Sequence, residues 1–176
     1  MNTITDNNKE KRLERRKKTA EDFTPLFLVN EILDRLTIDS NGSVWKEDKT
    51  FCDPACGNGN FLIEVLKRKL KLGHNPITAL KTLYGTDIQY DNIEECRLRL
   101  IKVIIKNFKS KSLKDSEKLE MCKIVRRNIK CTPFRNYPNG SLDYDFEFKD
   151  ATSDKEAQEW FEKVRSEKLI EQVKID

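Results

Sequence analysis

Asp53, Gly57 and Gly59 are the residues whose types and spacing best suit chemistry on a small ligand. They follow a short apolar segment that starts at Phe51 and precede a helix-like run, 61–70. Because glycine has no Cβ, the backbone at both glycines is free to turn sharply and to come close to a ligand. The helix that follows directs its unpaired N–H groups at that ligand. A strand, a glycine loop and a helix in this order predict a site for a nucleotide-like cofactor; the alternative is an ordinary strand–helix turn.

The spacing of the glycines argues against two common classes of nucleotide. A dinucleotide fingerprint requires a third glycine three residues after the second, and Leu62 stands at that position. A nucleoside triphosphate loop ends in Gly-Lys followed by Ser or Thr, which the segment lacks. Asp53 instead suits a ligand with a cationic end, because a carboxylate attracts an ammonium group and repels a phosphate.

Residues 53–62, Asp-Pro-Ala-Cys-Gly-Asn-Gly-Asn-Phe-Leu, resemble the S-adenosylmethionine loop of adenine-N6 DNA methyltransferases, whose pattern is Asp-Pro-x-x-Gly-x-Gly-x-Phe-Leu. The resemblance implies S-adenosyl-L-methionine as cofactor and a shortened Rossmann-like α/β fold, with a mostly parallel sheet and helices on both faces. It is strongest to short phage-type DNA methylases that keep the cofactor half of the fold. The loop residues that it assigns to the cofactor are Asp53, Pro54, Ala55, Cys56, Gly57, Gly59 and Phe61. Cys56 is interpreted as a small residue, not a nucleophile, because no histidine lies nearby in sequence to activate it.

A second acid, Asp87, ends a short apolar segment, 83–88, that is typical of another strand. In nucleotide-binding βαβ units, an acid at the tip of the second strand hydrogen-bonds the ribose hydroxyls. The separation from Asp53 exceeds that of dinucleotide folds, and an extra helix capped by Asn75 accounts for the excess. The resemblance therefore assigns Asp87 and Ile88 to the cofactor; the alternative is an acid in a turn at a strand end.

The tripeptide Phe23-Thr24-Pro25 precedes an amphipathic segment, 26–36. Thr24 is a suitable helix cap and Pro25 a suitable first helical residue. In the methyltransferase family, a Phe-Thr-Pro segment before the glycine loop closes over the methionine part of the cofactor. The three residues resemble that segment in order, composition and position. Both roles, cofactor contact and helix cap, are open at this stage, since one residue can serve both.

The resemblance does not extend to the residues that would hold a target base. Adenine-N6 methyltransferases carry Asn/Asp-Pro-Pro-Tyr/Phe after the fourth strand, where it binds the target amino group and stacks on a flipped base. The sequence contains no such tetrapeptide. Residues 136–140, Asn-Tyr-Pro-Asn-Gly, have the right types in the wrong order and are typical of a turn. Asp150 follows an alternating segment, 142–148, that is predicted as a strand, and is the candidate catalytic residue.

Further elements are predicted from hydrophobic periodicity. Residues 92–108 form a helix that is apolar nearly all round in its second half, as expected of a helix buried against a sheet. Residues 111–118 are a polar loop or a helix start, and 124–131 hold a third strand parallel to the others. A capping box at 153–156 opens a closing helix whose apolar stripe runs to Val173.

Composition limits the class of protein. The 176 residues are predicted to form a basic segment, 1–20, and a single methyltransferase-like domain, 21–176. Charged residues make up 36% of the chain, and no apolar stretch has the length of a membrane span. Five cysteines without a Cys-x-x-Cys pair, together with one histidine, predict neither a metal site nor a disulfide framework. Reduced thiols suit a cytoplasm, and the resemblance implies that of a bacterium or of a phage-infected host.

The net charge of +4 is concentrated in two basic regions, 9–18 and 102–130. Such regions attract nucleic-acid phosphates regardless of sequence, although solvated helix faces look the same. With the resemblance, DNA is the expected partner, and methyl transfer to adenine N6 the expected reaction if the chain is active. The alternative is a non-catalytic S-adenosylmethionine-binding subunit or decoy of a DNA modification system, with a partner subunit supplying catalytic or target-recognition elements. Methyl transfer to RNA or protein is a third possibility.

Overall fold

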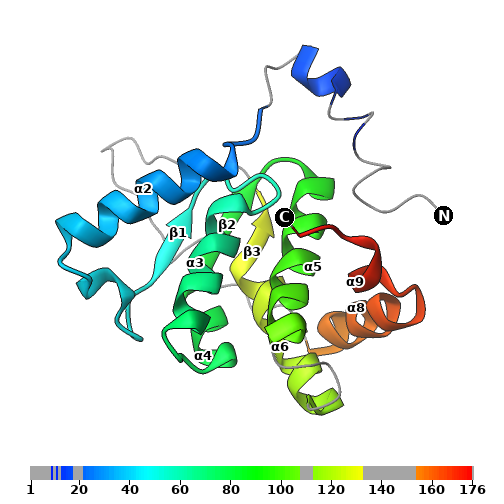
Figure 1. Ribbon diagram of the computed structural model, residues 1–176. Helices are drawn as coiled ribbons and strands as arrows, with labels where there is room; N and C mark the ends of the chain where they lie inside the picture. Colours follow the sequence, from blue (N-terminus) through cyan, green and yellow to red (C-terminus); the bar gives the residue numbers. More distant parts are fainter. Residues whose placement is uncertain are drawn as a thin grey trace, which may run out of the picture.

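A parallel three-stranded sheet forms the centre of the fold (Figure 1). The computed structural model describes residues 9, 11, 13–17, 22–107, 113–132 and 154–175. The strands, in sheet order, are β1 (Phe51–Asp53), β2 (Leu83–Asp87) and β3 (Ile129–Cys131). Asp53 pairs with Gly85, and Gly85 with Ile129, so the carboxyl ends of all three strands lie at one edge. The predicted α/β architecture with a parallel sheet is confirmed.

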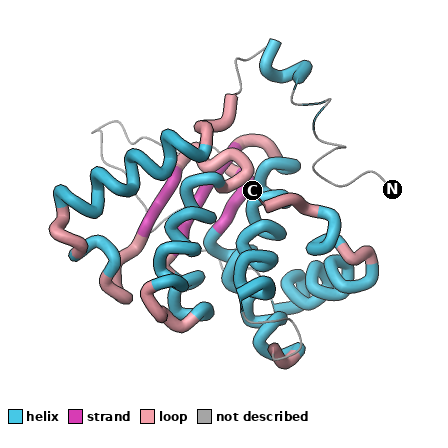
Figure 2. Tube along the Cα trace, in the orientation of Figure 1, coloured by secondary structure: helices cyan, strands magenta, loops and turns pink. Residues whose placement is uncertain are grey.

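Helices connect the strands, and further helices precede β1 and follow β3 in the chain (Figure 2). They are α2 (Leu26–Asp39), the short 3-10 helix η1 (Ser43–Trp45), α3 (Asn60–Lys71), α4 (Pro76–Lys81), α5 (Tyr90–Asn107), α6 (Asp115–Asn128), α8 (Asp154–Ser166) and α9 (Leu169–Gln172). α3 and α5 lie side by side on the sheet, and α2 lies beside α3. α8 packs on α6, and α9 packs on α5. None of these described helices has the length and apolar character needed to cross a membrane.

The core lies between α3, α5 and the sheet. α5 is buried nearly all round from Asn92 to Ile101, where α3, α6, α9 and the sheet surround it. The prediction placed this buried part in the second half of the helix, but only Val103 and Ile104 continue it, and Lys106 and Asn107 are exposed. Leu62 and Leu66 of α3 and Leu100 and Ile104 of α5 are almost fully buried. Each such side chain contributes about 1.5–3 kcal/mol of apolar transfer free energy. This core holds the amino end of α3, and therefore the glycine loop, firmly against α5.

Two predicted helix starts have different outcomes. The Asn75 side chain caps α4 by accepting hydrogen bonds from the N–H groups of Ile77 and Thr78, as predicted. Of the two roles left open for Thr24, the helix cap is not found: Pro25 occupies the N-cap position of α2, which has no side-chain cap. The helix starts one residue later than predicted because the carbonyl of Pro25 accepts its first hydrogen bonds.

The region predicted to hold the third strand is mostly helical. β3 is parallel and lies at the end of the predicted range, but Ile124 to Asn128 belong to α6. Ile124 and Val125 are buried at helical spacing after Met121. The Asn128 amide donates to the carbonyls of Lys81 and Leu83, which anchors the end of α6 beside β2. A short apolar run suits either element, and tertiary packing selected the helix.

The predicted closing helix is also divided. α8 ends at Ser166, and Lys168 adopts a left-handed conformation, with a φ of 49°, before α9 begins. Periodicity missed this turn because the apolar stripe continues across it. The predicted strand at 142–148, the turn at 136–140 and the candidate catalytic residue Asp150 lie outside the described residues.

Candidate functional site

The glycine loop between β1 and α3 requires both of its glycines. Gly57 and Gly59 have positive φ angles of 51° and 89°, which other residues rarely adopt. A Cβ on Gly59 would lie 2.5 Å from the Cys96 sulfur, and one on Gly57 would lie 2.7 Å from the Phe23 ring. Gly59 is therefore set by the packing of the loop on α5. Gly57 is set by the close approach of the segment that precedes α2.

Two carboxylates stand beside the loop at the ends of neighbouring strands. Asp87, at the end of β2, accepts hydrogen bonds from the N–H of Gly57 (3.0 Å) and of Gln89 (2.7 Å). Asp53, at the end of β1, accepts one from the N–H of Ala55 (3.2 Å). Burial raises the pKa of Asp53, the Ala55 N–H opposes that shift, and the charge of Asp87 adds to it. A cation bound here would lower the pKa of Asp53 again.

A hollow of about 110 Å³ lies between the loop and the segment before α2. Phe23 and Thr24 line one side of it. The predicted loop residues that line it are Asp53, Ala55, Cys56, Gly57 and Phe61. Asp22 also lines the hollow, and among the described residues no lysine or arginine lines it. Its hydrogen-bond acceptors therefore suit an ammonium group, and its described residues offer a phosphate no counter-charge.

The other predicted site residues surround the hollow without lining it. The carbonyl of Pro54 accepts a hydrogen bond from Thr86 Oγ1 (2.9 Å), and Pro25 starts α2. Gly59 starts α3. Asp87 supports the loop through the N–H of Gly57, as described above. Ile88 follows β2 and has a relative exposure of 68%, so its side chain is available to a ligand that extends past the strand ends.

Sequence reasoning missed a buried polar network beneath the loop. Arg99 Nη1 donates to the carbonyl of Asn58 and to Asn60 Oδ1, both at 2.9 Å. Asn58 Nδ2 donates to Glu95 Oε1 (3.1 Å), and Asn60 Nδ2 donates to the carbonyl of Thr24 (3.0 Å). Glu95 and Arg99 are 1% and 2% exposed. The network joins α5, the glycine loop and the segment before α2 into one unit. Its signal in the sequence is an acid and a base four residues apart on a largely apolar helix.

Asn58 also lines the hollow. Its buried Oδ1 is without a hydrogen-bond partner among the described residues. A buried amide oxygen without a partner is uncommon in proteins, and a bound donor group would satisfy it. Together with the carboxylates, this acceptor makes the hollow suitable for the ammonium end of a ligand.

Cys56 is a packing residue of the loop. It is 5% exposed, and the hydrogen bond with Cys96 and then burial raise the pKa of its thiol far above the usual range. A nucleophilic cysteine needs a lowered pKa, so the interpretation of Cys56 as a small loop residue agrees with its surroundings. Among the described residues, no group of histidine, cysteine and acidic side chains is arranged to hold a metal ion.

Comparison with known proteins places the chain in a family. The chain matches the N-6 DNA Methylase family over residues 10–162. The type II methyltransferase M.VspI of Vibrio sp. (strain 343) is 38% identical over 78 residues, which are 44% of this chain and 16% of that protein. The chain thus covers a small part of the length of this curated relative, and no solved structure matches it. Because the family match covers most of the chain, including the loop and both acids, the protein belongs to the N-6 DNA methylase family.

Proposed function

We propose that this chain binds S-adenosyl-L-methionine at the glycine loop and takes part in methyl transfer to adenine N6 in DNA. The observation that carries the proposal is the pair of carboxylates, Asp53 and Asp87, at the ends of β1 and β2 beside a loop hollow whose described lining residues include no cation. This charge distribution suits a cofactor with cationic groups. The family match supports the reaction class.

Each part of the site has a proposed role toward the cofactor. Asp53 would pair with the ammonium group, and Asp87 would accept hydrogen bonds from the ribose hydroxyls in addition to those from the backbone. Phe23, Thr24 and Pro25 would cover the methionine part. The residues that would form the remaining wall are Pro54, Ala55, Cys56, Gly57, Gly59, Phe61 and Ile88. The cofactor supplies an activated methyl group, and the chain orients it and excludes water.

DNA is the proposed substrate, and the basic segment that includes Arg15 is a proposed contact. Arg15 pairs with Asp91 at the start of α5 (3.1 Å), which holds the segment near the cofactor end of the sheet. The described cations nearby are exposed: Lys9, Lys11, Arg16 and Lys17. Asp150 remains the proposed acceptor for the target amino group. The described cysteines are free thiols, in agreement with a proposed cytoplasmic location.

A second candidate function is non-catalytic. The given sequence contains no Asn-Pro-Pro-Tyr tetrapeptide. This observation favours a cofactor-binding subunit whose partner supplies the catalytic and target-recognition elements, or a decoy in a DNA modification system. Both candidate functions require the same cofactor site and differ in methyl transfer by the isolated chain.

The cofactor site is tested by calorimetric titration with S-adenosylmethionine and S-adenosylhomocysteine. We expect micromolar binding that Asp53→Asn weakens at least tenfold, about 1.4 kcal/mol. Asp39→Asn, an exposed acid at the end of α2, is the matched control and should leave affinity unchanged. Absence of binding to the wild-type chain would refute the proposal. Transfer of a radiolabelled methyl group to unmodified DNA, lost in Asp150→Ala, would favour the enzyme; binding without transfer would favour the subunit.

A further inference from the structure

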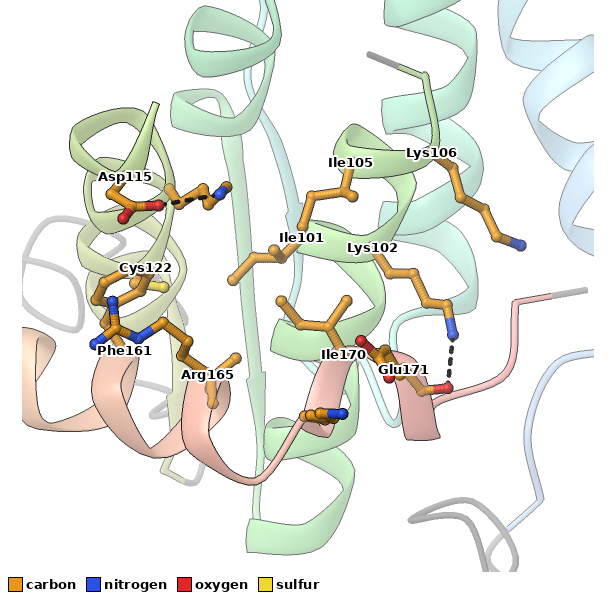
Figure 3. A pocket seen from close by; sticks show the side chains of 13 residues that line it. Ile101, Lys102, Ile105, Lys106, Asp115, Cys122, Phe161, Arg165, Ile170 and Glu171 are labelled. Atoms are coloured by element: carbon orange, nitrogen blue, oxygen red, sulfur yellow. Dashed lines mark hydrogen bonds and ion pairs between the residues drawn. The ribbon is translucent and has the colours of Figure 1, made fainter. Parts of the chain in front are cut away.

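A second hollow, larger than the one at the loop, lies among α5, α6, α8 and α9 (Figure 3). Its volume is about 360 Å³, and it opens beside the C-terminal half of α5. None of the predicted cofactor residues lines it. Ligand pockets for small molecules have volumes of about 300–1,000 Å³, so this hollow is large enough for a small ligand. Its chemistry differs from that of the cofactor site.

The floor of this second hollow is apolar. Ile101 and Ile105 of α5 face Ile170 of α9 across the opening (Figure 3). Phe161 and Val164 of α8 complete the floor. The turn at the end of α8 brings α9 back onto α5, so these side chains enclose a space instead of filling it. A water-filled apolar hollow is unfavourable, and an apolar ligand group would stabilise it.

The rim of this hollow is cationic. Its lysines and arginine are Lys102, Lys106, Lys118, Arg165 and Lys168, against two acids, Asp115 and Glu171. Asp115 pairs with Lys118 (3.0 Å), and Arg165 pairs with Glu162 (2.7 Å). Lys106 and Lys168 are exposed, and neither has a carboxylate partner within the described part of the chain. The rim therefore keeps two uncompensated positive charges beside an apolar floor.

Lys102 adds to this positive field from a less exposed position. Its Nζ donates to the main-chain carbonyls of Glu171 and Val173, which fixes the end of α9 against α5. Burial lowers the pKa of Lys102, and the neighbouring charge of Lys106 lowers it further. An anionic group at the rim would relieve the repulsion between these two ammonium groups.

We propose that this second hollow binds a small amphipathic anion, an alkyl or aryl chain that carries one carboxylate or phosphate head. The apolar part would contact Ile101, Ile105 and Ile170, and the head would lie between Lys106 and Lys168. Charge complementarity selects the anion, and the hollow's volume suits a small molecule better than a protein helix, whose diameter is about 10 Å. The site is separate from the proposed cofactor site and independent of methyl transfer.

Matched ligands test the proposal on the full chain without cofactor. Decanoate, decyl phosphate, decanol and decylamine are titrated below their micelle concentrations and followed by calorimetry. We expect both anions to bind, decanol to bind at least tenfold more weakly, about 1.4 kcal/mol, and decylamine not to bind. Preference for decyl phosphate over decanoate, or the reverse, identifies the head group. Equal affinity for decanol and decanoate, or no binding of any anion, would overturn the proposal.

Two variants locate the binding. Lys106→Gln/Lys168→Gln should lower decanoate affinity about tenfold, while the control Lys46→Gln/Lys71→Gln, two exposed lysines away from the hollow, should not. Ile170→Trp should abolish binding by filling the floor. If Ile170→Trp fails to fold by circular dichroism, the lysine pair still decides, because both of its side chains are exposed. If the double lysine variant binds duplex DNA more weakly and binds decanoate unchanged, the rim binds nucleic-acid phosphates and the proposal is wrong.

Discussion

The two hollows of this protein have opposite chemistry. In the described part of the chain, the hollow at the glycine loop is lined by the acids Asp22 and Asp53 and by no cation, and hydrogen bonds from α5 support it. The hollow among α5, α6, α8 and α9 has a cationic rim and an apolar floor. One helix serves both: Glu95 and Arg99 support the loop, and Ile105 lies in the floor of the second hollow. Hydrogen bonds fix the residues that line the loop hollow, whereas helix packing fixes those that line the second hollow.

Arg99→Met gives the largest expected difference between the two hollows. It leaves the carbonyl of Asn58 and the side chain of Asn60 without their buried donor, beside the carboxylate of Glu95. We expect urea unfolding to show a loss of about 3–5 kcal/mol, as for a broken buried charge network. Arg165→Met, at the rim of the second hollow, removes an exposed ion pair and should cost at most about 1 kcal/mol. Similar losses of unfolding free energy in both variants would mean that the loop network stabilises the fold no more than an exposed ion pair does.

Gly59→Ala tests how tightly the loop packs on α5. The new Cβ would meet the Cys96 sulfur at 2.5 Å, and the positive φ of 89° adds backbone strain. We expect a loss of about 3 kcal/mol in the free energy of unfolding, from about 1–3 kcal/mol of overpacking and about 1 kcal/mol of backbone strain. Gly73→Ala is the matched control, since its φ is 86° and nothing lies within 4 Å of its Cβ position. Equal losses would show that packing at Cys96 relaxes freely.

The buried acid of the loop predicts a distinct pH dependence. The raised pKa of Asp53 means that the folded protein binds a proton more tightly than the unfolded chain. Stability contributed by that proton is present below the usual value of 3.8 and is lost as pH rises through the folded pKa. Asp53→Asn should therefore stabilise the protein at neutral pH and lose this advantage in acid, as measured by urea unfolding across pH.

The second hollow should show the opposite pH behaviour. The lowered pKa of Lys102 means that the folded protein binds this proton less tightly than the unfolded chain, so the free energy of unfolding rises between the folded pKa and 10.5. Lys102→Met removes the titrating group, so its stability relative to wild type should be constant at lower pH and should fall across that alkaline window in the same urea series. A change in that difference on the acid side would contradict the assignment of the pKa shift to burial.

The contrast between the hollows also explains what the sequence could predict. The loop could be predicted because Asp53, Gly57 and Gly59 lie close together in the sequence and their conformational needs are local. The polar network that supports the loop could not be predicted, because Glu95 and Arg99 reach their partners only where α5 passes beneath the loop in the fold. The second hollow is formed by side chains from four helices that are separate in the sequence. Its existence depends on the turn between α8 and α9, where hydrophobic periodicity gives no boundary.

Ile88→Ser gives the smallest expected effect on stability and still separates binding from folding. The side chain is 68% exposed at the end of β2, so the free energy of unfolding should change by less than about 0.5 kcal/mol. If Ile88 packs on the bound cofactor as proposed, S-adenosylmethionine affinity should fall several-fold, because the contact would remove apolar surface from water. Ile38→Ser, at 72% exposure on α2, is the control and should change neither quantity. A loss of affinity in Ile88→Ser with decanoate binding unchanged would show that the two hollows are occupied independently; unchanged affinity would remove Ile88 from the cofactor site.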